Sequence, residues 1–187
     1  MKKFKLTSEF IVDISGVKLF RIKALIEFGN VKAGDLGGYI EKEENLSHMG
    51  NAWVSGNAQV SGDAQVFGDA RVSGNAWVSG DARVFGNAQV SGDAQVFGNA
   101  WVSGDAWVPG NAQVSGDKDY AYAHGFGSCN RTTTFFRLKD GDVGVRCGCF
   151  YGTLAQFRDN VCETHGETKK AQEYLMLADL MDFRFKN

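Results

Sequence analysis

The sequence predicts a mainly β protein whose centre is a solenoid of short parallel strands. Glycine recurs every six residues from Gly50 to Gly116, and valine keeps the same period from Val54 to Val114. No α-helix repeats every six residues, and glycine at this frequency would destabilise a helix by about 1 kcal/mol per site. A period of six instead suits short strands, in which every second side chain points the same way, joined by turns.

The repeat unit also predicts where each residue type lies. Each glycine is followed by Asn or Asp and then by Ala, and a Val stands two positions after the Ala. Gly, Asn and Asp tolerate the positive φ angles that tight corners need, so we expect them at the corners. The Ala and Val side chains then point inward and stack on their equivalents in the next coil. Residues 50–117 form this repeat region.

Units such as VSGNAQ and VFGDAR resemble the hexapeptide repeat of left-handed parallel β-helices. The resemblance implies that three units make one triangular coil of about eighteen residues. The repeat region would then form about four left-handed coils.

Side chains one coil apart are expected to stack on the outside of this rod. The outward position after Ala carries a tryptophan in four units, at Trp53, Trp77, Trp101 and Trp107. Large exposed aromatic side chains on a rigid rod suggest a contact surface for a partner. The alternative is that the flanking segments, or a neighbouring subunit, cover them.

Residues 1–49 are expected to cap the solenoid. They predict a pair of strands around a turn at residues 14–16, followed by an irregular first coil. Such a cap covers strand edges that the end coil would otherwise expose. The inward side chains of the irregular coil are expected to be Val31, Leu36, Ile40 and Leu46.

Residues 118–187 predict a C-terminal ββαα domain. A hairpin is expected around residues 139–142, where Asp-Gly is a turn signal. Thr153 and Gln156 have the spacing of a capping box, so a helix should begin there and end at Gly166. A second helix should follow Thr168.

Charge and hydropathy exclude some classes of protein. The formal net charge is −2, and the repeat region carries six Asp against two Arg. A dedicated nucleic-acid-binding protein would show a strongly basic face, so nucleic acid is not the expected partner. No apolar run has the length of a membrane span, and the first residues lack the apolar core of a signal peptide. We therefore expect a cytoplasmic protein with its four cysteines reduced.

The sequence does not decide whether the protein is an enzyme, but it favours a non-enzyme. No cofactor is expected. Many left-handed β-helix proteins are trimeric acyltransferases that use a histidine near a subunit boundary as general base. The repeat region contains no histidine, and His48 just before it is a weak catalytic candidate. The histidines through which related carbonic anhydrases bind zinc on their coils are missing as well.

Cysteine and histidine residues of the C-terminal region form a weak candidate for a metal site. On a strand, Cys147 and Cys149 would point to the same face. Further ligands for a tetrahedral zinc site could come from Cys129, Cys162, His124 and His165. No CxxC pair is present, and free cysteine is also a common small buried side chain, so packing is the favoured interpretation.

A second candidate site in this region would bind an anion. Asn130, Arg131, Arg137 and Arg146 could line one face of the predicted hairpin and capture a phosphate or a carboxylate. Arg131 and Arg137 have the same parity on one strand, whereas Arg146 needs the right register on the other. The alternative is a polar strand face that simply contacts solvent.

The whole chain resembles uncharacterised hexapeptide transferase-like proteins of bacteriophages and prophages. The resemblance rests on GNVKAGDLGGYIE, the repeat region, NRTTTFF and CGCF. It implies a homotrimer in a bacterial host cell. Two functions follow as hypotheses: a non-catalytic oligomeric scaffold that binds a host protein or a small anionic ligand, with an anti-defence role, or an acyltransferase-like enzyme with its active site at the trimer interface.

Overall fold

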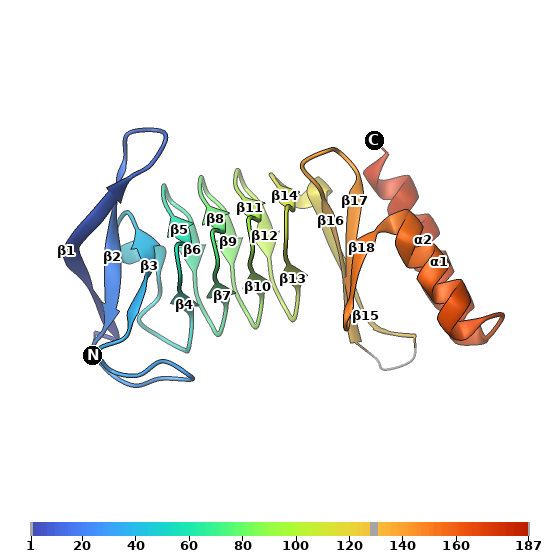
Figure 1. Ribbon diagram of the computed structural model, residues 1–187, viewed down its shortest axis with the longest axis horizontal. Coiled ribbons are helices and arrows are strands. Elements are labelled where there is room, and N and C mark those ends of the chain that lie inside the picture. Colours follow the sequence, from blue (N-terminus) through green and yellow to red (C-terminus); the bar gives the residue numbers. More distant parts are fainter. Residues whose placement is uncertain (1, 128–130, 187) are drawn as a thin grey trace.

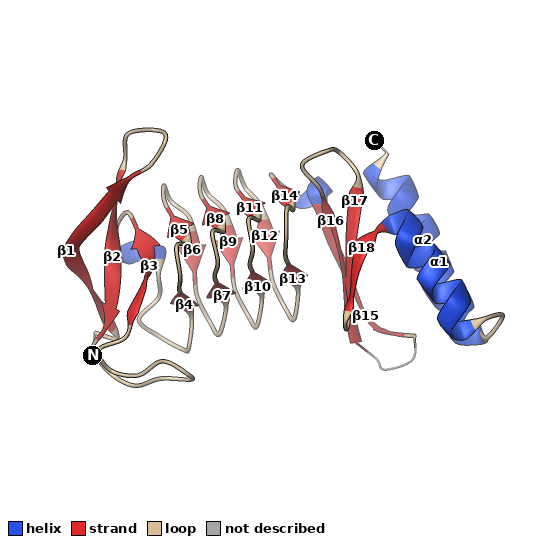
Figure 2. Cartoon of the chain, in the orientation of Figure 1, coloured by secondary structure: helices blue, strands red, loops and turns tan. Residues whose placement is uncertain are grey.

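The computed structural model describes residues 2–127 and 131–186. The molecule is an elongated rod with the N-terminal strands at one end and two helices at the other (Figure 1). Between them lie about four stacked parallel coils, and helix is concentrated at the C-terminal end (Figure 2). The predicted fold class, a mainly β solenoid, is confirmed. The left-handed sense of the coils stays a prediction.

The coils are built from two-residue strands that stack into three parallel faces. One face contains β5, β8, β11 and β14, a second contains β4, β7, β10 and β13, and the third contains β6, β9 and β12. The strands are β4 (Trp53–Val54), β5 (Gln59–Val60), β6 (Gln65–Val66), β7 (Arg71–Val72), β8 (Trp77–Val78), β9 (Arg83–Val84), β10 (Gln89–Val90), β11 (Gln95–Val96), β12 (Trp101–Val102), β13 (Trp107–Val108) and β14 (Gln113–Val114).

The eighteen-residue register of the coils is the one that the repeat predicts. Val54 lies beside Val72, and Val72 lies beside Val90. The Val and Ala side chains of all these units are fully or almost fully buried. Glycine is required at the corners for two reasons: Gly74 has φ +72°, and a Cβ there would lie 2.9 Å from the carbonyl oxygen of Gly92.

Asparagine side chains connect successive coils at the corners. Asn51 Nδ2 donates to Asp69 Oδ1 at 3.0 Å, and Asn87 Nδ2 donates to Asp105 Oδ1 at 2.8 Å. The alternation of Asn and Asp thus replaces carboxylate repulsion with a hydrogen bond. On the third corner Asp63 binds Lys42 Nζ at 2.6 Å, and this hydrogen bond lowers the pKa of the Asp63 carboxyl.

The N-terminal segment extends one face of the solenoid. The strands β1 (Phe4–Val12) and β2 (Lys18–Ala24) pair antiparallel, as predicted, and β3 (Leu36–Ile40) joins β2 to β5. Of the predicted inward side chains, Val31, Ile40 and Leu46 are buried. The prediction for Leu36 is wrong: it is 53% exposed, because it begins β3 outside the region that the first coil covers.

The C-terminal region contains more strand than the predicted hairpin. In the described residues, β15 (Tyr120–Phe126), β16 (Arg131–Arg137), β17 (Val143–Cys147) and β18 (Phe150–Thr153) form an antiparallel sheet in chain order. The strand β15 was not predicted, because its Ala and Gly residues are poor strand formers. The strand β18 was not predicted, because only a two-residue turn, Gly148-Cys149, separates it from β17.

This sheet is the middle layer between the solenoid and the helices (Figure 1). Phe136 belongs to the core of the solenoid, whereas Phe135 belongs to a second core with the helices. The helices are α1 (Leu154–His165) and α2 (Lys169–Phe185), and Thr153 and Gln156 form the predicted capping box. Within the described residues, no helix has both the length and the apolar character to cross a membrane.

Candidate functional site

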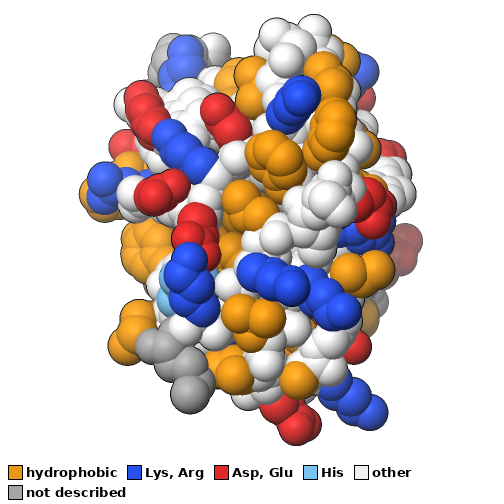
Figure 3. Space-filling view, turned by 90° about the vertical axis from the view of Figure 1, so that its left-hand side faces the viewer, with side chains coloured by type: hydrophobic (Ala, Val, Ile, Leu, Met, Phe, Trp, Pro, Cys, Tyr) orange, Lys and Arg blue, Asp and Glu red, His pale blue; other side chains and the backbone are white. Residues whose placement is uncertain are grey.

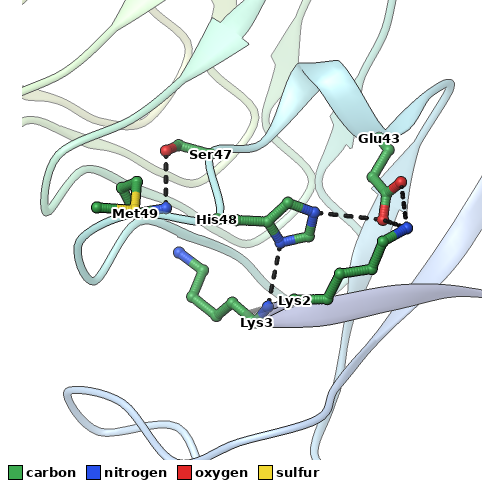
Figure 4. Close-up of polar contacts among 6 residues, drawn as sticks. All are labelled: Lys2, Lys3, Glu43, Ser47, His48 and Met49. Carbon is green, nitrogen blue, oxygen red and sulfur yellow. Dashed lines mark hydrogen bonds and ion pairs between the residues drawn. The ribbon is translucent and has the colours of Figure 1, made fainter.

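His48, the catalytic candidate, is held between β1 and the short 3₁₀ helix η1 (Glu43–Asn45) (Figure 4). Its Nδ1 accepts the backbone N–H of Lys3 at 3.1 Å, and its Nε2 lies 3.2 Å from Glu43 Oε1. The ring also stacks on Phe4, with 4.4 Å between ring centroids. Since Nδ1 acts as an acceptor, the imidazole proton resides on Nε2 and points to the Glu43 carboxylate.

This arrangement leaves His48 without an acceptor for a substrate proton. A general base needs a lone pair directed at the group that it deprotonates, and the lone pair of neutral His48 is already used by the backbone. Lys2 Nζ binds the Glu43 carboxylate at 2.8 Å and lowers its pKa, so Glu43 is ionised and orients the ring. The geometry therefore supports a structural role for His48, which connects β1 to the first coil.

The four tryptophans differ in exposure, although the repeat places them equivalently. Trp53 is only 4% exposed, because the ring of Phe28 covers it at 5.4 Å between centroids. The prediction that Trp53 is an exposed contact residue is therefore wrong. Trp77 is half-buried and donates from Nε1 to Ser61 Oγ, whereas Trp101 is 51% exposed.

Trp101 continues a row of aromatic rings along the solenoid, which we call the aromatic stripe (Phe67, Phe85 and Trp101). The Phe67 and Phe85 rings are parallel, with centroids 4.9 Å apart, and Trp101 meets Phe85 edge-on at 6.2 Å. Neither phenylalanine was predicted as a site residue. Their signal is the replacement of Ser by Phe at two positions one coil apart.

The candidate metal ligands lie on the C-terminal sheet and at the end of α1. Cys147 ends β17 and accepts a hydrogen bond from Thr133 Oγ1, whereas Cys149 is exposed in the turn. The expectation that both cysteines share one strand face is wrong, because the chain reverses at Gly148 with φ +59°. His124 contacts Thr132 at 3.0 Å, and His165 stacks on Tyr174.

Within residues 2–127 and 131–186, no group of three or more His, Cys, Asp or Glu side chains is close enough together to hold a metal ion. Cys129 and Asn130 lie outside the described residues.

The three candidate arginines do not share a face of the sheet. Arg137 lies on the helix side, where its guanidinium donates to the carbonyl oxygens of Phe185 and Gly141. Arg146 pairs with Thr134 across the strands and faces the solenoid. The predicted grouping of all three is therefore wrong, because the register of β16 and β17 puts Arg137 and Arg146 on opposite faces.

Arg131 and Arg146 do come together, at a cavity of about 350 Å³ between the last coil and the sheet. The Arg146 guanidinium lies over the ring of Trp107, with its central carbon 3.8 Å from the ring centroid. We call this cavity the junction pocket. Its lining residues are Asp105, Trp107, His124, Arg131, Thr132, Thr134, Arg146 and Gly148.

Comparison with known proteins concerns the solenoid. A family model described as "YdcK Beta solenoid repeat" matches residues 64–80, 76–92 and 94–110. No curated protein matches the chain. The matched segments are the coils that the structure stacks between β6 and β13. The chain is thus a repeat β-helix protein whose central coils are similar to the YdcK β-solenoid repeat.

Proposed function

We propose that this protein is a non-catalytic scaffold that assembles with copies of itself along the aromatic stripe and presents its C-terminal region to a partner. The observation that carries the proposal is the stripe itself. Its three rings make continuous contact across successive coils, yet half of Trp101 is exposed. A core of Val and Ala buries little surface per coil, so a neighbouring subunit on this face would add apolar burial.

The acyltransferase-like alternative lacks support from the geometry of His48. The catalytic base of such an enzyme would need the lone pair that His48 gives to the backbone N–H of Lys3. We therefore favour binding over catalysis.

Further parts of the proposal rest on the resemblance to phage and prophage proteins. They are the homotrimer, a phage origin, the cytoplasm of a bacterial cell as the place of action, and a host protein as partner with an anti-defence role. The C-terminal sheet and helices are suited to present a partner surface, because they project from the end of the rod (Figure 1).

The test is native mass spectrometry and light scattering of the full-length chain and a Phe67→Ser/Phe85→Ser variant. Serine suits these corners, since Ser103 stands at the next one. We expect the wild type to be an oligomer and the variant to dissociate at least about tenfold more readily, because an apolar anchor is lost. Phe97→Ser is the control, since Phe97 is half-buried on a different corner.

A wild type that stays monomeric at micromolar concentration would refute self-association. So would a double variant that is as oligomeric as Phe97→Ser. A wild-type mass of three chains would support the trimer, and any other oligomer would refute the trimer while keeping the scaffold.

A further inference from the structure

Arg146 has an unusual shortage of hydrogen-bond partners. Among the described residues, the buried side-chain nitrogens without a partner are the Nε atoms of Arg21 and Arg146. Arg21 is nevertheless neutralised, because its Nη1 lies 3.2 Å from Glu9 Oε1. Arg146 has no ion pair with any described residue and donates from Nη1 to the carbonyl of Cys149 at 3.3 Å. The guanidinium of Arg146 is partly exposed and lacks a counter-charge among the described residues, so an anion could pair with it.

The Arg146 guanidinium is also held in place before any ligand arrives. It lies over the ring of Trp107, and the indole donates a hydrogen bond from Nε1 to Ser91 Oγ at 3.0 Å. The backbone N–H of Trp107 donates to Thr134 Oγ1 at 3.2 Å, which ties the sheet to the last coil. A ligand at this position therefore meets a donor whose orientation is already determined.

A second arginine and a hydroxyl complete the donor set of the junction pocket. The Arg131 side chain lines the pocket and has no hydrogen bond or ion pair with any residue in 2–127 or 131–186. Thr134 is almost fully buried and accepts from the Trp107 N–H, so the hydroxyl that a ligand can reach is that of Thr132. His124 and Thr132 contact each other at 3.0 Å and line the same pocket.

The donor set indicates the chemical class of the ligand. Two guanidinium groups and a hydroxyl offer more N–H and O–H donors than the two oxygens of one carboxylate need, whereas a phosphoryl group has three terminal oxygens. The volume of about 350 Å³ leaves room for a group attached to the phosphorus. We propose that the junction pocket binds the phosphoryl group of a small phosphorylated molecule.

The carboxylate of Asp105 would repel such an anionic ligand. It lines the pocket and accepts from Asn87 Nδ2 at 2.8 Å. Its replacement by Asn keeps an acceptor oxygen for Asn87 and suits the corner, where Asn and Asp alternate. Asp105→Asn should therefore strengthen anion binding without disturbing the coil.

This binding site deepens the proposed binding role, but it is separate from self-association, because the aromatic stripe contributes no residue to the pocket. The experiment is calorimetric titration of the full-length protein, at constant ionic strength, with inorganic phosphate, adenosine monophosphate and succinate. We expect one saturable site per chain for the two phosphoryl compounds and weaker binding of succinate. Arg146→Gln and Arg131→Gln should each weaken binding at least about tenfold, and Asp105→Asn should tighten it.

Arg83→Gln is the matched control, because Arg83 also lies over a tryptophan, 5.1 Å from the ring centroid of Trp101. It should leave phosphate binding unchanged. Should Arg146→Gln fail to fold, Arg146→Lys retains the charge without the planar donor set and should still bind several-fold more weakly than the wild type. In arginine Nε–H NMR spectra, the signal that is lost in either Arg146 variant should shift when phosphate is added to the wild type.

Three results would overturn the site: no saturable phosphate binding by either the wild type or Asp105→Asn up to about 10 mM, wild-type affinity in a folded Arg146 variant, or succinate binding as tight as phosphate. Stronger binding of adenosine monophosphate than of inorganic phosphate would assign the ligand to the nucleotides, and equal binding would assign recognition to the phosphoryl group. Native masses of the same samples separate failure of this site from failure of self-association.

Discussion

The two ends of the solenoid close in chemically opposite ways. Along the coils, the N–H of each outward residue donates to a carbonyl of the next coil, as Gln59 does to Ala76 at 2.9 Å. The carbonyls of the first coil have no earlier coil whose N–H groups could donate to them. The N–H groups of the last coil have no later coil whose carbonyls could accept from them. One end therefore requires donors and the other requires acceptors.

Two buried side chains supply donors at the first coil, in addition to the backbone N–H groups of Tyr39, Glu41 and Ser47, which donate to Ala58, Val60 and Val66. Lys3 Nζ donates to Ala52 at 2.8 Å and, at 3.3 Å, to Gly50. Asn45 Nδ2 donates to Gly62 at 3.0 Å and to Ala64 at 2.9 Å.

The last coil uses oxygen acceptors and a proline instead. Thr134 Oγ1 accepts the N–H of Trp107, and Asp119 Oδ2 accepts the N–H of Ser115, both at 3.2 Å. Pro109 stands one coil after Ser91, whose N–H donates to Val108. Proline has no N–H, so the single proline of the sequence removes a donor where no acceptor follows.

At both ends of the solenoid, specific side chains therefore pair with backbone groups that the end coils would otherwise leave without hydrogen-bond partners. The outer surface of the N-terminal cap adds to this effect: Figure 3 shows basic and acidic side chains interspersed with hydrophobic ones. Phe10, Val12 and Ile14 are exposed there. Such a mixed surface discourages the end-to-end pairing that a bare coil would invite.

The largest expected effect comes from the N-terminal donor that makes the most hydrogen bonds. Asn45→Leu would remove two donated bonds and the bond that Asn45 Oδ1 accepts from the Lys42 N–H. We expect a loss of about 3 kcal/mol in the free energy of unfolding, because buried backbone groups would lose their partners. Urea denaturation measures it, with Glu44→Gln on the same turn as the exposed control. A loss no greater than that of the control would contradict the capping role.

Lys3→Met should have the next largest effect. It leaves two carbonyls unpaired but also removes the cost of burying an ammonium group, so we expect a smaller loss, of about 2 kcal/mol. The exposed Lys5 on the same strand provides the control Lys5→Met. Equal stability of the two variants would show that Lys3 is not needed at this end.

The burial of Lys3 also predicts how the stability of the N-terminal end depends on pH. Burial lowers its pKa from 10.5 to about 8. Between these values the unfolded chain binds a proton that the folded chain has released, so stability rises with pH across this window and is lost as pH falls through about 8. We expect the wild type to gain about 1–2 kcal/mol relative to Lys3→Met between the two ends of the window, measured by urea denaturation. A constant difference would mean that the ammonium pays no burial cost.

At the C-terminal end, Thr134→Val should cost about 1 kcal/mol. Valine has nearly the same shape but leaves the Trp107 N–H without its acceptor. Thr133→Val is the matched control, since Thr133 is equally buried and its hydroxyl donates to the weak acceptor Cys147 Sγ. A greater loss in the control than in Thr134→Val would argue against the closing role of Thr134.

Pro109→Ser should have the smallest effect, a loss of about 0.5 kcal/mol. It restores the serine of the repeat and adds an N–H without an acceptor. It also raises the conformational entropy of the unfolded chain. The reverse exchange inside the rod, Ser73→Pro, removes a bond that exists, from Ser73 N to Val90 O at 2.9 Å. Thermal denaturation should show a larger loss for Ser73→Pro, and the opposite order would refute the distinction between interior and end.

The candidate sites could be predicted only in part. Alternation along β16 grouped Arg131 with Arg137 rather than with Arg146. The meeting of Arg131 and Arg146 beside Trp107 depends instead on how the sheet docks on the last coil. The exposure of Trp53 and Trp101 also could not be read from the repeat, since Phe28 covers one of two equivalent positions. No local pattern marks such contacts between distant segments.

The sequence by itself determined the coils, their register, the inward Val and Ala ladders, both ends of α1 and the start of α2. These features follow from a period and from capping residues that act over a few positions. The tertiary structure alone decided which side chains close the rod. Lys3 and Asn45 bind carbonyls of the first coil, and Lys3 lies more than forty residues from them along the chain. Such pairings depend on unpaired groups at the coil ends, and these groups exist only after the coils have stacked.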